Sequence, residues 1–175
     1  MAVIITLMAF ELRPPAGATV AAVVQQLPAL LVYALSFAFV GIYWNNHHHL
    51  LRSARRISAA VMWTNLLLLF WLSLIPVLTL WLRSDYDRPL PVAAYGIVAL
   101  ISGFSYSLLQ RALVNANGRD SELAHAVAND IKGWTSLLLY VLGVASAFLT
   151  PWLSYALYVS VSLMWFLPDR RLIRR

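Results

Sequence analysis

The chain has 175 residues, of which 61% are hydrophobic and only 11% are charged, whereas soluble domains are about half apolar and a quarter charged. This composition excludes an ordinary water-soluble domain, and the absence of cysteine excludes a disulfide framework and a thiolate metal site. The net charge of +6 does not indicate nucleic-acid binding, because the basic residues gather at the ends of apolar segments and not along one polar face.

The apolar residues form runs near the ~20 residues that a helix needs to cross a bilayer. They predict an all-α polytopic membrane protein, a six-transmembrane-helix bundle that forms a single domain over residues 1–175. The first helix, over residues 1–12, is truncated relative to the ~20 residues that ~30 Å of hydrocarbon requires. The other helices are expected over residues 20–51, 57–82, 90–114, 134–149 and 152–167.

Lys and Arg residues are distributed unevenly between the two ends of these helices, and basic loops stay in the cytoplasm. One end carries ten of them and the other three, which predicts that both termini are cytoplasmic and that the chain lies in the cell inner (plasma) membrane. The larger set is Arg52, Arg55, Arg56, Arg111, Arg119, Lys132, Arg170, Arg171, Arg174 and Arg175, and the smaller set is Arg13, Arg83 and Arg88.

Residues 44–49, Trp-Asn-Asn-His-His-His, form a polar cluster at the cytoplasmic end of the second span. Imidazoles bind transition metals, but adjacent helical residues point about 100° apart, so the three histidines do not face one ion. His125 is the remaining histidine. We therefore favour structural hydrogen bonding over a metal site, and we expect no enzyme and no cofactor.

Asn65 lies within the apolar third span, where an amide is costly unless it finds a partner in the bundle interior. An interhelical hydrogen bond is its expected role. The predicted spans contain no carboxylate of the kind that proton-coupled carriers use, and the chain lacks the T-V-G-Y-G loop of the familiar potassium filter.

The order of several motifs resembles the endolysosomal potassium channel family (transmembrane protein 175-like), whose bacterial members have six helices and assemble as homotetramers. The resemblance covers nearly the whole chain, and its most specific part is Trp-x-x-His-His with an Asn in the next span. The family's usual Arg and Phe-Ser-Asp signature has no counterpart before Met1. The motifs are Ser36-Phe37, Trp44, His47-His48, Asn65-Leu66, Pro76 and residues 165–169, Trp-Phe-Leu-Pro-Asp.

This resemblance implies a potassium-permeable channel whose central pore is lined by the first helix. The run from Ala2 to Leu7 matches the family's first helix, which places the hydrophobic constriction at Val3 and the family's threonine at Thr6. Leu7 and Phe10 continue the same face at helical spacing. Judged by their helical spacing alone, these four residues are also compatible with an apolar stripe that packs against other helices and lines no pore. The resemblance also implies that Trp44, His47, His48 and Asn65 form a structural polar network.

The expected partners are the lipid bilayer, further copies of the chain and monovalent cations, with potassium as the permeant ion. Two other functions remain open at this point. A small secondary transporter or a non-conducting scaffold bundle is compatible with the absent filter and the short first helix, and an enzyme built on the histidine cluster would require a bound transition metal.

Overall fold

The structure, a computed structural model, describes residues 1–10, 12, 14–15, 17–118, 121, 124 and 130–166. Every regular element in this part of the chain is a helix, which confirms the all-α prediction. Some residues used above lie outside the described part: His125, the end of the last expected span and of its motif at residues 167–169, and the basic residues Arg13, Arg119, Arg170, Arg171, Arg174 and Arg175.

Three stretches of the described chain are long and apolar enough to cross a membrane, as a multi-pass membrane protein requires. The first is α2 (Val20–Arg52), the second combines α3 (Ala59–Ser73) with α4 (Ile75–Ser84), and the third is α5 (Pro89–Asn117). Side-chain caps stabilise the first turns of two of these helices. The Thr19 hydroxyl accepts a hydrogen bond from Ala22 N at the start of α2, and Ser58 does the same for Val61 N in α3.

The second span is interrupted between α3 and α4. Pro76 has no backbone N–H and therefore cannot donate to the carbonyl of Leu72, four residues earlier. The chain adapts by ending α3 at Ser73 and by directing the N–H of Leu74 to the carbonyls of Trp71 and Leu72. Pro28, in contrast, lies inside α2 without ending it. The segment expected as one helix over residues 57–82 is thus two consecutive helices.

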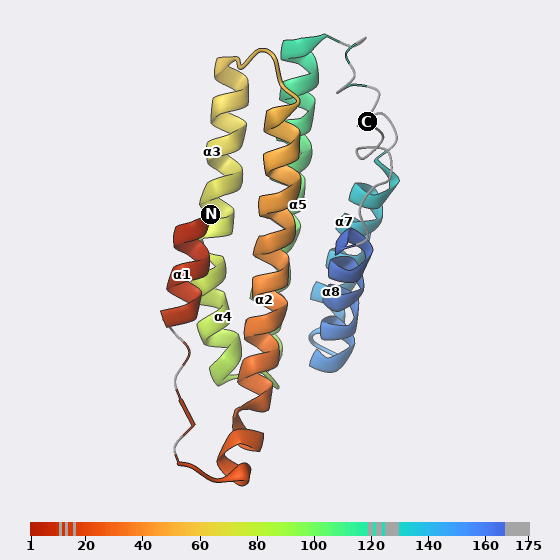
Figure 1. The fold of residues 1–175 in the computed structure, drawn as a ribbon. Coiled ribbons are helices and arrows are strands. Elements are labelled where there is room, and N and C mark those ends of the chain that lie inside the picture. Colours follow the sequence, from red (N-terminus) through yellow and green to blue (C-terminus); the bar gives the residue numbers. More distant parts are fainter. Residues whose placement is uncertain are drawn as a thin grey trace.

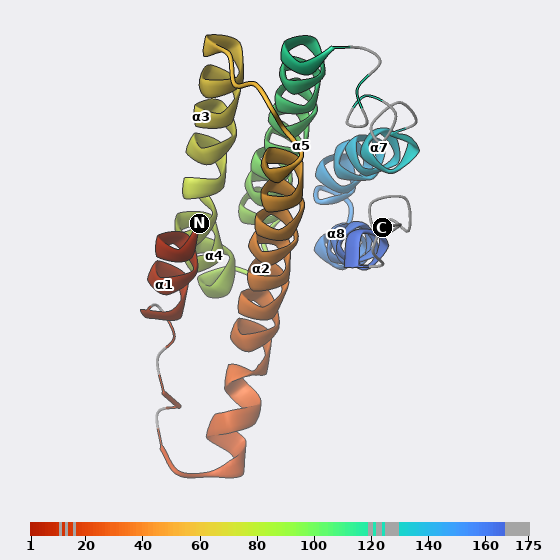
Figure 2. The ribbon, with the colours of Figure 1, turned by 45° about the horizontal axis from the view of Figure 1, so that its top comes forward.

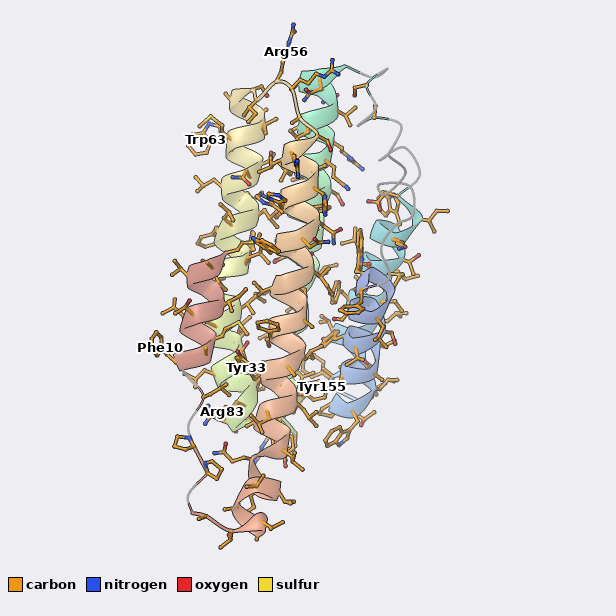
Figure 3. All side chains as sticks on the ribbon, in the orientation of Figure 1. Phe10, Tyr33, Arg56, Trp63, Arg83 and Tyr155 are labelled. Atoms are coloured by element: carbon orange, nitrogen blue, oxygen red, sulfur yellow. The ribbon has the colours of Figure 1, made fainter. Side chains whose placement is uncertain are left out.

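The shorter helices lie on opposite sides of these spans (Figures 1 and 2). The nine-residue α1 (Ala2–Phe10) packs against α4 and α2, whereas α7 (Ile131–Ser146) and α8 (Pro151–Phe166) form a hairpin beside α5. The N-terminal end of α1 points toward the end of the bundle where α2 connects to α3 (Figure 1). Arg56 lies at that end and Arg83 at the other (Figure 3).

The core is organised around α5, which contacts α3, α4, α7 and α8. Small side chains let the hairpin approach closely, as is typical of helix packing in membranes. A Cβ atom on Gly96 of α5 or Gly143 of α7 would overlap the Tyr158 ring of α8. The Tyr158 hydroxyl donates to the carbonyl of Val92 at 3.2 Å, and Ser154 of α8 donates to the carbonyl of Gly143 at 2.7 Å.

Asn117 fastens the loop between α2 and α3 to the end of α5. Its Oδ1 accepts hydrogen bonds from the backbone N–H groups of Arg55 and Arg56, both at 2.8 Å. Its Nδ2 donates to the carbonyl of Arg56 at 3.0 Å and to that of Leu113 at 2.9 Å. One amide side chain therefore supplies the backbone partners that this loop lacks.

Candidate pore surface and polar network

The short helix α1 has two different faces. Ile4 and Met8 are buried against the bundle. Val3, Leu7 and Phe10 are 70%, 52% and 81% exposed. Residues three and four apart share one side of a helix, so these side chains form a continuous outward apolar stripe.

Thr6 lies on the same outward face as this stripe. Its hydroxyl donates to the carbonyl of Ala2 in its own helix at 3.0 Å, and the oxygen keeps its capacity to accept. We name Val3, Thr6, Leu7 and Phe10 the α1 outer face. The structure brings all four predicted pore residues onto this surface.

The α1 outer face lies at the edge of a single chain, and Phe10 points away from the bundle (Figure 3). The adjacent side of α3 is also apolar and exposed, with Trp63 at 71% and Phe70 at 55% exposure. Trp63 extends on the same side of the molecule as Phe10 (Figure 3). A pore lined by α1 therefore requires several copies of the chain, because the described residues of one chain place nothing opposite this face.

Of the predicted polar network, the structure brings His47 of α2 and Asn65 of α3 together. His47 Nε2 lies 2.6 Å from Asn65 Oδ1, so the imidazole carries a proton on Nε2 and donates to the amide oxygen. Both side chains are half-buried. The contact joins two membrane spans and gives the Asn65 amide oxygen a partner within apolar surroundings.

Trp44 and His48 lie one helical turn apart and stack on each other, with ring centroids 6.0 Å apart and planes inclined by 19°. Both are exposed, Trp44 at 54%. His48 and His49 meet edge to face at 6.0 Å. His47 thus contacts Asn65 of α3, whereas His48 and His49 contact each other at the exposed surface. Within the described ranges no three His, Cys, Asp or Glu residues are grouped as metal ligands.

A second feature was not predicted from the sequence. A cavity of about 40 Å³ lies between α2, α5, α7 and α8, and aromatic rings form much of its wall. The rings of Phe39 and Tyr43, four residues apart on α2, are in contact with centroids 4.8 Å apart and planes inclined by 52°. Tyr43 meets Tyr106 of α5 edge to face at 5.9 Å. The only sequence signal for this cavity was the spacing of Phe39 and Tyr43, which are four residues apart and therefore neighbours on one side of a helix.

Comparison with known proteins places this architecture in a family. A family model described as the endosomal/lysosomal potassium channel TMEM175 matches residues 1–76, which include α1, α2 and α3. A potassium channel from Chryseobacterium sp. (strain P1-3) is 40% identical over 172 residues, covering 98% of this chain and 90% of the relative. The chain belongs to the TMEM175 family.

Two further matches are more distant. A potassium channel from Streptomyces collinus is 29% identical over 116 residues, covering 62% of this chain and 56% of the relative. The crystal structure of a lysosomal potassium-selective channel TMEM175 homolog from Chamaesiphon minutus superimposes with a TM-score of 0.81 at 22% identity. It covers 95% of this chain and 90% of the other, so the TMEM175 fold extends across the described helices.

Proposed function

We propose that this TMEM175 family member is one subunit of a potassium-permeable channel that conducts passively through a pore lined by α1. The observation that carries the pore assignment is the α1 outer face: Val3, Thr6, Leu7 and Phe10 are exposed on the helix whose opposite side packs on α4 and α2. The potassium assignment follows from the Chryseobacterium relative, which is named a potassium channel.

The chemistry of this face suits a hydrophobic gate. A ring of valine side chains narrows a pore and expels water from it, so that ions cannot pass until the ring widens. Thr6 lies one turn from Val3, and its hydroxyl oxygen can replace part of the hydration shell of a potassium ion. Leu7 and Phe10 continue the apolar lining toward the end of the helix.

Closure of the pore needs symmetric copies, and we propose a homotetramer, the assembly that the family resemblance implies. A cyclic arrangement would place the same face of each α1 around one axis. The exposed apolar side of α3 lies next to α1 and offers surface for contact with a neighbouring subunit or with lipid. In this proposal the His47–Asn65 hydrogen bond and the Trp44–His48 stack have structural roles.

We also propose that the protein lies in the cell inner (plasma) membrane with the Arg56 end of the bundle in the cytoplasm. The basic residues at that end support this orientation, and the N-terminal end of α1 points toward it (Figure 1). A channel performs no bond-making chemistry, so we assign no enzymatic role and no cofactor, only permeant potassium ions.

The test is current measurement in planar bilayers under a potassium/sodium gradient. Val3→Ala removes two methyl groups from each copy of the ring and is expected to raise leak several-fold, because the gap becomes wider and wetter. Val141→Ala is the matched control, since Val141 is a half-exposed valine on the distant α7. It should leave the leak unchanged.

The selectivity assignment needs its own variant. Thr6→Val keeps the shape but removes the hydroxyl, and it should lower the potassium-over-sodium permeability ratio. Ser160→Ala serves as its control, because Ser160 is an exposed hydroxyl on α8 that donates to the carbonyl of Ala156 in its own helix, as Thr6 does in α1. Unchanged leak in Val3→Ala together with an unchanged reversal potential in Thr6→Val would reject the pore assignment.

Two other outcomes would replace the channel proposal. Saturable flux without unitary currents would identify a transporter, and silence of a protein that runs as an intact assembly would favour a scaffold. Light scattering or native mass spectrometry gives the oligomeric state independently, and a mass other than that of four chains would reject the tetramer.

A further inference from the structure

The aromatic cavity between α2, α5, α7 and α8 has a lining that suits a cation. The rings of Phe39, Tyr43, Tyr106, Tyr140 and Trp165 surround about 40 Å³ of open space. Phe39 and Tyr140 are 3% exposed, so this part of the wall is buried in the core. Aromatic faces carry negative potential and attract ammonium groups, most strongly where water is excluded.

The Trp165 ring is fixed in place and already attracts an ammonium group of the chain. Its Nε1 donates to Ser136 Oγ at 2.8 Å, which orients the indole across the cavity wall. Lys132 Nζ lies 6.0 Å from the ring centroid, within the range of a cation–π contact. The ring therefore works as a surface for positive charge in this fold.

Asp130 adds a carboxylate to the same cavity lining. Its Oδ1 caps α7 by accepting a hydrogen bond from Gly133 N at 2.8 Å, and the second carboxylate oxygen has capacity for another donor. Gly133 makes this position possible, because a Cβ atom there would overlap the Asp130 carboxylate. The cavity wall thus combines aromatic rings with the Asp130 carboxylate, and the Lys132 ammonium over Trp165 is the positive charge with which a bound ammonium shares this wall.

A larger cavity of about 280 Å³ lies between α5 and α7 and shares Ser107 and Asp130 with the aromatic cavity. Arg111 contributes a cation to this outer cavity, and arginine is well suited to binding phosphate. Apolar side chains complete its wall, including Phe104 and Trp134, which are 52% and 66% exposed. The outer cavity therefore offers a phosphate site that opens onto lipid-accessible apolar surface.

We propose that the two cavities together bind the headgroup of a zwitterionic phospholipid with an ammonium group. The ammonium enters the aromatic cavity beside Asp130, the phosphate pairs with Arg111, and the acyl chains leave along Phe104 and Trp134. The Asp130 carboxylate lines the inner, aromatic cavity and the Arg111 guanidinium lines the outer one. This order of charges is complementary to a headgroup whose ammonium lies inside and whose phosphate lies outside.

Position and size agree with this assignment. Asp130 begins α7 and Arg111 lies near the end of α5, on the side of the bundle that carries Arg56, where headgroups of one leaflet lie. A water molecule needs ~10–15 Å³ of such space, so about 40 Å³ accommodates a group of about three heavy atoms, the size of an aminoethyl group. The site is independent of the pore assignment, because α1 contributes nothing to it.

The test is competition binding of phosphatidylethanolamine and phosphatidylglycerol with identical acyl chains, measured by native mass spectrometry of the full chain. The wild type should retain phosphatidylethanolamine about fivefold more strongly, the effect of one partly exposed ion pair. Asp130→Asn keeps the cap of α7, since Asn caps helices as well as Asp, and it should abolish this preference. Arg111→Gln should weaken both lipids similarly, because both carry a phosphate.

Matched controls come from the opposite end of α5. Asp87→Asn and Arg88→Gln make the same charge changes at exposed residues outside both cavities, and neither should alter lipid retention. Equal retention of the two lipids by the wild type would overturn the proposal, and so would an unchanged preference in Asp130→Asn. Soluble phosphoethanolamine distinguishes the source: no displacement of lipid supports a phospholipid ligand, whereas displacement at millimolar concentration would reassign the site to a free amine.

Discussion

The hydrogen bond between His47 and Asn65 allows a quantitative test of how much one polar contact stabilises this bundle. Asn65→Leu replaces the amide by an apolar group of similar volume, so packing changes little while the 2.6 Å contact is lost. Hydrogen bonds between membrane helices average ~0.6 kcal/mol and reach ~1.7 kcal/mol. Because this contact is short and half-buried, we expect a coupling energy of about 1 kcal/mol.

The assay is a double-mutant cycle of His47→Phe and Asn65→Leu. Unfolding in mixed micelles with rising dodecyl sulfate is followed by the helical circular dichroism signal, and the coupling is the difference between the double variant and the sum of the single variants. Thr64→Val is the control, because the Thr64 hydroxyl donates only within its own helix, to the carbonyls of Ala60 and Val61.

Two results would refute this reasoning. A coupling energy below ~0.3 kcal/mol lies within the error of additivity and would mean that water or lipid replaces the contact at no cost. A loss of stability in Thr64→Val equal to that in Asn65→Leu would mean that α3 responds to any polar-to-apolar change and that the partner on α2 is irrelevant.

Two further predictions concern packing and the loop at the end of α5. Gly96→Ala should cost ~1–3 kcal/mol of unfolding free energy, because the new methyl group would displace Tyr158. Gly41→Ala should be neutral or stabilising in the same unfolding assay, because its new methyl group would enter open space. Asn117→Ala should speed proteolysis of the loop between α2 and α3, whereas Asn115→Ala should not. Equal cleavage rates in the two asparagine variants would contradict the role assigned to Asn117.

The fold was predictable from the sequence where one property of a segment decides the outcome. Apolar length alone identifies α2 and α5 as membrane spans. The third span was expected as one helix despite Pro76, and the effect of a proline depends on whether the neighbouring carbonyls find other partners. Pro28 is accommodated within α2, while Pro76 separates α3 from α4. Both prolines lie inside apolar spans, so the sequence alone does not distinguish these two cases.

The two candidate sites also differ in how far the sequence predicts them. The outward position of Val3 and Phe10 follows from helical spacing together with the family resemblance, whereas spacing alone allowed a buried stripe. The aromatic cavity could not be predicted, because Phe39, Tyr106 and Trp165 come from three helices widely separated in sequence. In its own segment, each of these rings has the pattern of an ordinary buried core residue. Only the packing of the α7–α8 hairpin brings them together.

The close fit of this hairpin to α5 has a consequence for biosynthesis. Lipid tails are as apolar as leucine, so helices already in the bilayer gain little from burying apolar surface against one another. α7 and α8, which are made after α5, must therefore recognise it through close fit and hydrogen bonding, by way of Gly96, Gly143 and the Tyr158 side chain. An added methyl at either glycine would not hinder insertion into the membrane, since apolarity governs that step. The resulting chain would be inserted and correctly oriented, yet its hairpin would pack less tightly on α5.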